Sequence, residues 1–179
     1  MTEFLFPDNT VLCNFAVVHQ LHLLKSVLNG RGQWTGAVAY EAQRSSQSLP
    51  DLAALISEGW MSEPIEIAAD ADIQRVQRLR RVVFGGTDDS PLKHLGEAET
   101  CFVISEWPAY AGSWWISDDR EALRYARGRG IITRETIDLM GIAVANGELT
   151  AQSAYDAMVS MIVSGRYLRM PKTAQELRL

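Results

Sequence analysis

Cysteine and histidine are scarce in this sequence of 179 residues, which holds two cysteines and three histidines. Cys13 and Cys101 are far apart and each lies in an apolar run, so we expect buried thiols and no disulfide framework. His19, His22 and His94 do not have the spacing of a zinc site or of a catalytic triad. The reduced thiols and the lack of a basic leader sequence lead us to expect a cytoplasmic protein.

Long apolar runs and an excess of positive charge are also missing. No segment reaches the ~18 uninterrupted apolar residues of a membrane-spanning helix, so we expect no membrane partner. The net charge is -5, so any contact with nucleic acid must come from a local basic patch. Hydrophobic residues make up 47% of the chain and charged residues 22%, which favours a globular domain over a disordered chain.

Short apolar runs alternate with stretches of helical periodicity along the chain. We expect strands at 4–6, 34–37, 65–67, 114–116 and 131–133. We expect helices at 11–28 with a break near His19, and at 38–44, 49–57, 72–83, 96–107, 120–128, 136–145 and 150–163. Short strands that are apolar on both faces indicate an α/β fold with a parallel sheet covered by helices.

A chain of this length with no internal repeat and no long linker is expected to form one domain. We place this domain at residues 1–170, with an enlarged helical segment at about 57–92. Residues 171–179 are polar and are expected to form a surface helix or a C-terminal tail.

Acidic residues occur where the chain is expected to leave the sheet. Asp8 follows the first strand, and Asp118 and Asp119 follow the strand at 114–116. Sites in parallel α/β sheets form beyond the carboxyl ends of the strands, so we expect these acids to lie together.

Two expected helices add further carboxylates. Glu41 lies near the start of one helix, and Glu97 and Glu99 lie at the start of another. Acids that converge at one end of a sheet repel one another strongly unless a counter-ion is present. Because oxygen ligands suit hard cations such as Mg²⁺ or Mn²⁺, the acids together predict a metal site that activates water and holds a phosphodiester.

Each acid also has an interpretation without any function. Asp8 can cap the helix that follows it, and Asp118 or Asp119 can cap the helix at 120–128. Glu41 can be a solvated helix residue, and acids at a helix start are favoured by the helix dipole alone. The combination, and no single acid, therefore carries the metal-site hypothesis.

Four acidic segments occur in a fixed order along the chain. They are Phe6-Pro7-Asp8-Asn9-Thr10, Tyr40-Glu41, Leu95-Gly96-Glu97-Ala98-Glu99 and Ile116-Ser117-Asp118-Asp119-Arg120. Together they resemble the PIN-domain family, the fold of VapC-type toxin ribonucleases, and the third segment is similar to the Gly-Glu-x-Glu form of one branch. The resemblance covers nearly the whole chain and implies a PIN-like three-layer α/β/α sandwich with a short, mostly parallel central sheet.

The resemblance also implies roles for individual residues. The implied catalytic acids are Asp8, Glu41, Glu97 and Asp119. The implied ligands of one or two Mg²⁺ or Mn²⁺ ions are Asp8, Glu97, Asp118 and Asp119, of which Asp118 is a close substitute for Asp119. Thr10 and Ser117 would hold these ligands by hydrogen bonds. The implied activity is that of an endoribonuclease that hydrolyses RNA phosphodiesters with metal-activated water.

A VapC-type ribonuclease is the toxin of a toxin–antitoxin pair, so the resemblance implies a cognate antitoxin protein and a homodimer. The sequence departs from the family pattern in the long segment at 57–92 and in Arg134-Glu135-Thr136, which stands where a Gly-Thr pair is common. The long segment and the negative net charge keep an alternative open. In this alternative the chain is a catalytically weak or inactive PIN-like module that binds RNA or protein.

Four arginines fall in the helix expected at 72–83. Arg75, Arg78 and Arg81 lie on one side of this helix, where they could contact RNA phosphates. A solvated helix face explains the same pattern somewhat better, and both interpretations stay open.

Phosphatases and nucleotide-binding P-loops are disfavoured. A phosphatase of the haloacid-dehalogenase type needs Asp-x-Asp after the first strand, whereas Asn9-Thr10 follow Asp8. Gly85-Gly86 is not followed by the Lys-Ser/Thr pair of a P-loop.

Overall fold

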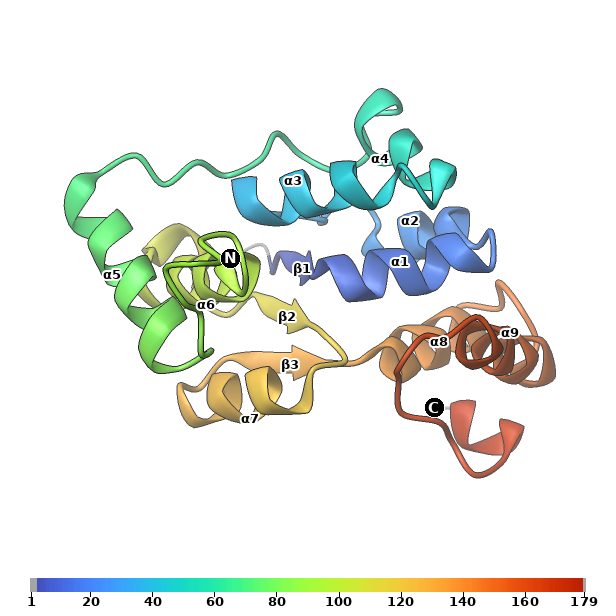
Figure 1. The fold of residues 1–179 in the computed structure, drawn as a ribbon. Helices are drawn as coiled ribbons and strands as arrows, with labels where there is room; N and C mark the ends of the chain where they lie inside the picture. Colours follow the sequence, from blue (N-terminus) through green and yellow to red (C-terminus); the bar gives the residue numbers. More distant parts are fainter. Residues whose placement is uncertain (1–2, 179) are drawn as a thin grey trace.

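Three short parallel strands form the centre of the fold (Figure 1). The computed structural model describes residues 3–178. The strands β1 (Leu5–Pro7), β2 (Trp114–Ile116) and β3 (Ile132–Arg134) lie side by side in the order β1-β2-β3. Phe6 pairs with Trp115, which in turn pairs with Thr133. All three strands therefore end at the same edge of the sheet.

Helices make up most of the remaining chain. The α-helices are α1 (Asn9–Val17), α2 (Leu21–Leu28), α3 (Gly36–Ser45), α4 (Ala53–Ser57), α5 (Asp70–Val82), α6 (Leu95–Glu106), α7 (Arg120–Gly128), α8 (Thr136–Ala145) and α9 (Ala151–Val163). The 3-10 helices are η1 (Pro50–Leu52), η2 (Pro108–Tyr110) and η3 (Ala174–Leu177). In the described part of the chain, no helix is both long and apolar enough to cross a membrane.

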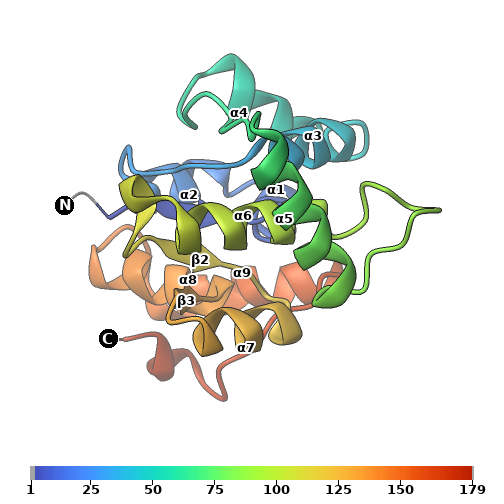
Figure 2. The same cartoon turned by 90° about the vertical axis from the view of Figure 1, so that its left-hand side faces the viewer.

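The sheet is covered on both faces, because successive strand residues point to opposite sides. Leu5 and Ile116 belong to one buried cluster, which they share with α1, α2, α3, α8 and α9. Phe6 and Trp115 belong to a second cluster, which they share with α5, α6 and α7. The expected α/β architecture, with helices on either side of a small parallel sheet, is confirmed (Figure 2).

Two of the expected strands are wrong as strands. At 34–37 the chain makes only an isolated parallel bridge from Thr35 to Ile65, and Gly36 already begins α3. The region at 65–67 contributes only its half of this bridge. A second isolated bridge joins Gly32 to Leu5. These segments continue the sheet beyond β1 by single pairings, because helix α3 starts too early for a longer strand to form.

Capping residues and chain breaks in the sequence predicted the boundaries of several elements correctly. The expected strand at 114–116 and the helices at 120–128 and 136–145 are confirmed. The break near His19 is confirmed as well, since His19 has a φ of 56° and separates α1 from α2.

The segment at 57–92 is less helical than expected. Only α5 lies within it, preceded by an irregular connection and followed by an exposed loop that projects from the body in Figure 2. Arg80 fixes this loop, because its buried guanidinium donates hydrogen bonds to the carbonyl oxygens of Thr87 at 3.0 Å and Ser90 at 3.2 Å. A charged group that is 1% exposed therefore serves as the anchor of the loop.

The end of the chain differs from the expected tail. Ala174 and Leu177 of η3 are buried in the first cluster, and η3 packs against α8 and α9. Because the residues around this apolar pair are polar, the sequence alone did not indicate that the pair is buried.

Candidate functional site at the carboxyl edge of the sheet

The backbone pairing of the strands continues for one residue beyond their ends. The amide of Asp8 donates to the carbonyl oxygen of Ile116 at 2.9 Å, and the amide of Ser117 donates to that of Arg134 at 3.0 Å. Asp8 and Ser117 are thereby held at the carboxyl edge, where sites in such sheets form.

The Asp8 carboxylate is held by neighbours on two elements. Its Oδ1 accepts hydrogen bonds from the amides of Thr10 at 2.7 Å and Val11 at 3.1 Å, and also from the Thr10 hydroxyl. Its Oδ2 accepts a hydrogen bond from the Ser117 hydroxyl. Asp8 therefore caps α1, and Thr10 and Ser117 contact it in the way the resemblance implies. Burial raises the pKa of Asp8, although these hydrogen bonds act against the rise.

Glu41 lies on α3 and approaches the start of α6. A Cβ atom added to Gly96 would lie 3.4 Å from Glu41 Oε1 and 3.1 Å from a methyl carbon of Val38. Glycine at this position therefore allows the carboxylate to rest against the α6 backbone. Burial raises the pKa of Glu41 to about 8, and the charges of Glu97 and Asp8 add to the rise.

The two acids of α6 have different surroundings. Glu97 is in the first turn, and its Oε1 lies 3.0 Å from Nδ1 of His94. Glu99 accepts a hydrogen bond at 3.0 Å from the amide of Ala37, one of the free N–H groups at the start of α3. Burial raises the pKa of Glu99, and the hydrogen bond from the Ala37 amide acts against the rise. Glu99 therefore fastens α3 to α6, while Glu97 contributes its charge to the group around Glu41.

Asp118 and Asp119 are adjacent in sequence but differ in position. The Asp118 carboxylate accepts hydrogen bonds from the Thr136 amide at 3.0 Å, the Thr136 hydroxyl at 2.5 Å and the Asn14 amide group at 2.8 Å. Burial raises the pKa of Asp118 to about 6, and the nearby charge of Asp8 contributes to this rise. Asp118 therefore lies with Asp8 in the acidic group.

Asp119 performs a different task. Its Oδ1 accepts hydrogen bonds from the amides of Glu121 at 2.8 Å and Ala122 at 3.0 Å, so it caps α7. The residue is exposed and borders a separate cavity that it shares with Phe84 and His94. The structure thus brings together Asp8, Glu41, Glu97 and Asp118, which we call the carboxylate cluster, and places Asp119 beside it.

Two polar residues that sequence reasoning missed support the cluster. Asn14 is fully buried, donates to Asp118 and accepts a hydrogen bond at 2.8 Å from Nε of Arg166. Arg166 also donates to the carbonyl oxygen of Thr10 at 3.3 Å. The one signal in the sequence was an asparagine within an apolar helical run, because a buried amide requires polar partners.

A cavity of about 430 Å³ adjoins Asp118 on the side of the C-terminal segment. Its basic and aromatic lining residues are Arg120, Arg166, Tyr167 and Arg169. Arg169 is paired with Glu135 at 2.9 Å, and Tyr167 is 91% exposed. Cationic and aromatic side chains therefore border the carboxylate cluster here.

The arginines expected to contact RNA lie elsewhere, on α5. Arg75 is paired with Glu106 at 2.5 Å, and Arg81 is paired with Asp88 at 2.8 Å. Arg78 is exposed and has no ion pair or hydrogen bond with any residue from 3 to 178. All three are exposed to solvent, and two of them are engaged in ion pairs.

The residues of the carboxylate cluster fit a hard divalent cation in the chemistry of their donors. All four offer carboxylate oxygens as ligands. In the described part of the chain, no ion pair involves Asp8, Glu41 or Asp118. A bound cation would be stabilised because it would reduce the repulsion between their negative charges. However, within residues 3–178 no three Asp, Glu, His or Cys side chains are already arranged to hold a metal ion. A bound cation would have to draw these side chains closer together.

Comparison with known proteins identified no relative of this chain. No protein-family model, curated protein or solved structure matches the chain.

Proposed function

We propose that this protein is a metal-dependent endoribonuclease that uses the carboxylate cluster to hydrolyse RNA phosphodiesters. The observation that carries the proposal is the gathering of four carboxylates from β1, α3, α6 and the end of β2 at one edge of a parallel sheet. Asp8 is buried, Glu41 and Asp118 are partly buried, and none of the three has an ion-pair partner among the described residues; grouping such acids is costly to the fold, which favours a function over a purely structural role.

Mg²⁺ or Mn²⁺ would be held by Asp8, Glu97 and Asp118, and it would supply Lewis-acid stabilisation of the phosphodiester and acidify water. Asp8 is fixed in orientation by the Ser117 and Thr10 hydroxyls. Asp118 is fixed by Thr136 and by Asn14, which Arg166 orients in turn. These contacts hold the Asp8 and Asp118 carboxylates at the edge of the sheet.

Glu41 is the residue suited to proton transfer. With no cation bound its pKa is raised to about 8, so a fraction of the Glu41 side chains is ionised near neutral pH and can accept a proton, which is the property required of a general base. It is held against Gly96 and close enough to Asp8 and Glu97 for their charges to affect it. We assign to Glu41 the removal of a proton from the attacking water.

The cavity beside Asp118 would receive the RNA chain next to the scissile bond. Arg120 and Arg166 would pair with phosphates, and the exposed ring of Tyr167 would stack on a base. These contacts give a local basic surface to a chain whose net charge is -5.

The resemblance to VapC-type proteins extends the proposal to the biological setting. The protein would be a cytoplasmic toxin, restrained by a cognate antitoxin protein, and would act as a homodimer. These parts of the proposal rest on the sequence resemblance alone.

A cleavage assay tests the activity. Purified protein is incubated with total RNA in Mn²⁺, in Mg²⁺ and in EDTA, alongside an Asp8→Asn variant whose folding is checked by circular dichroism. We expect cleavage that depends on the metal and is abolished by Asp8→Asn. Cleavage by folded Asp8→Asn protein at the wild-type rate would refute the proposal, because the activity would then come from elsewhere or from a contaminant.

One observation favours a second candidate, an inactive PIN-like module that binds RNA or protein. Within the described residues, the carboxylates are not preformed as a metal site. In this case RNA binding would be measurable in EDTA, and no metal would elicit cleavage of any RNA in the same assay.

A further inference from the structure

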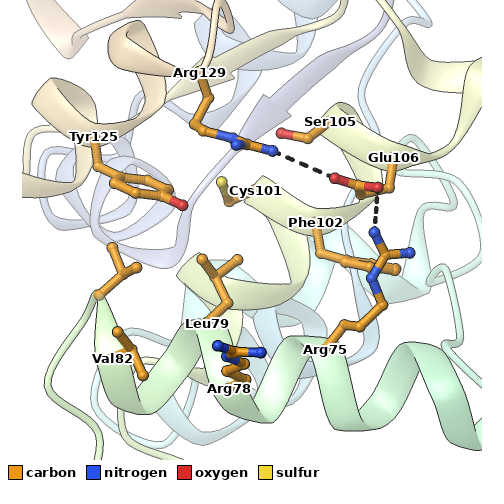
Figure 3. A pocket seen from close by; sticks show the side chains of 11 residues that line it. Arg75, Arg78, Leu79, Val82, Cys101, Phe102, Ser105, Glu106, Tyr125 and Arg129 are labelled. Atoms are coloured by element: carbon orange, nitrogen blue, oxygen red, sulfur yellow. Dashed lines mark hydrogen bonds and ion pairs between the residues drawn. The ribbon is translucent and has the colours of Figure 1, made fainter.

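A third cavity lies between α5, α6 and α7 (Figure 3). Its volume is about 430 Å³, which is within the range of about 300–1,000 Å³ typical of small-molecule sites. None of the four acids of the carboxylate cluster is among the residues that line it. This cavity is therefore a separate place on the molecule. We call it the arginine-lined cavity.

Positive charge dominates its border. Arg75 and Arg78 reach it from α5, and Arg129 reaches it from the end of α7 (Figure 3). Glu106 lies between two of these arginines, with its oxygens 2.5 Å from Arg75 and 3.4 Å from Arg129. Glu106 is the one carboxylate among the lining residues, Asp72 lies 3.9 Å from Arg75 outside the lining, and Arg78 has no ion-pair partner among the described residues. The cavity carries an excess positive charge that an anion would complement.

The interior of the cavity is apolar and aromatic. Leu79 and the ring of Phe102 line it from α5 and α6, and the ring of Tyr125 lines it from α7. The guanidinium of Arg75 lies 5.3 Å from the centre of the Phe102 ring, so the cationic and aromatic groups are in contact. An anion with a flat, apolar ring attached would match both parts of this lining.

We propose that the arginine-lined cavity binds a nucleotide, with its phosphate paired to Arg78 and Arg129 and its base against Leu79 and Tyr125, because the Phe102 ring is 4% exposed and is already covered by Arg75. A nucleotide combines the two features that the lining requires, a phosphate with up to two negative charges and a planar ring. The nucleotide is either free or one unit of a single-stranded RNA. In the second form the inference extends the proposed function, because the cavity would hold substrate RNA at a distance from the scissile bond.

Arg78 provides the sharpest test, because its side chain is exposed and makes no hydrogen bond or ion pair with any described residue. Binding of AMP, UMP, adenosine and inorganic phosphate is measured by isothermal titration calorimetry. The protein is the Asp8→Asn variant in EDTA, so that no cleavage occurs. Arg78→Ala is compared with Arg124→Ala, which removes an exposed arginine of α7 that does not line this cavity.

We expect a nucleoside monophosphate to bind more tightly than either adenosine or phosphate. Arg78→Ala should raise its Kd about tenfold or more, whereas Arg124→Ala should leave it within twofold. If a five-nucleotide RNA binds more tightly than the nucleoside monophosphate, and Arg78→Ala raises its Kd by the same factor, the ligand is single-stranded RNA. If the RNA binds equally or more weakly, the ligand is the free nucleotide.

Two results would overturn the inference. One is the absence of nucleotide binding at millimolar concentration, and the other is an equal Kd for Arg78→Ala and Arg124→Ala. The test is independent of catalysis. If wild-type protein fails to cleave RNA but the nucleotide titration gives the expected pattern, the proposed function fails and this inference stands.

Discussion

The raised pKa of Glu41 predicts an unusual dependence of stability on pH. In the unfolded chain this carboxyl titrates near 4.5, and in the folded protein it titrates at about 8. Between these two values the folded state holds a proton that the unfolded state has released. The free energy of unfolding must therefore fall as the pH rises from about 4.5 to 8, which is opposite to the effect of a carboxylate in a salt bridge.

The size of this effect follows from the two pKa values. Each pKa unit corresponds to about 1.4 kcal/mol, so the interval from 4.5 to about 8 sets a ceiling of about 5 kcal/mol. Glu41 is only partly buried, and water at the edge of the sheet screens its charge. We therefore expect about half of the ceiling, roughly 2 kcal/mol.

The assay compares Glu41→Gln with the wild-type protein in EDTA by urea unfolding at pH 5, 6, 7 and 8. Glutamine keeps the shape of the side chain but cannot ionise, so the variant should gain roughly 2 kcal/mol relative to wild type between pH 5 and pH 8. Glu121→Gln, which removes an exposed carboxylate of α7, is the control for the loss of one negative charge. The reasoning is refuted if Glu41→Gln and wild type change with pH in parallel.

Three further predictions concern single side chains. Asp118→Asn should abolish metal-dependent RNA cleavage. Asp119→Asn should reduce it less than tenfold, because an asparagine still caps α7. A larger loss for Asp119→Asn than for Asp118→Asn in a cleavage assay would contradict our placement of the two acids. Arg80→Ala should lower the free energy of unfolding by about 3 kcal/mol, since buried carbonyl groups lose their donor, whereas the exposed Arg81→Ala should change it by less than about 1 kcal/mol in urea unfolding. Asn14→Ala should reduce cleavage and destabilise the fold by about 2 kcal/mol; a fully stable and active variant would show that Asp118 does not depend on this amide.

The central elements of the fold were predictable because strong local signals mark them. Ser117, Asp118 and Asp119 stop the apolar run of β2, and Asp119 is a good cap for α7, so both boundaries followed from the sequence. The apolar alternation at 65–67 predicted a strand that does not form. Ile65 makes only a single pairing with Thr35, because the tertiary context decides whether a strand extends.

The site was predictable in composition but not in detail. The positions of the acids at strand ends and helix starts indicated that they would meet, which is a property of parallel sheets. Sequence could not decide between Asp118 and Asp119, because the choice depends on which carboxylate turns to cap α7. The link from Asp118 through Asn14 to Arg166 spans 152 residues between its last two members and leaves no local signal.

The central claim is that the carboxylate cluster binds the divalent cation that the proposed cleavage requires. Crystals soaked in Mn²⁺ and measured by anomalous diffraction test it directly. We predict an anomalous peak bounded by the carboxylates of Asp8, Glu97 and Asp118, and no such peak in Asp8→Asn crystals under the same conditions. Occupancy of other sites only, with these side chains unmoved and uncoordinated, would contradict the claim.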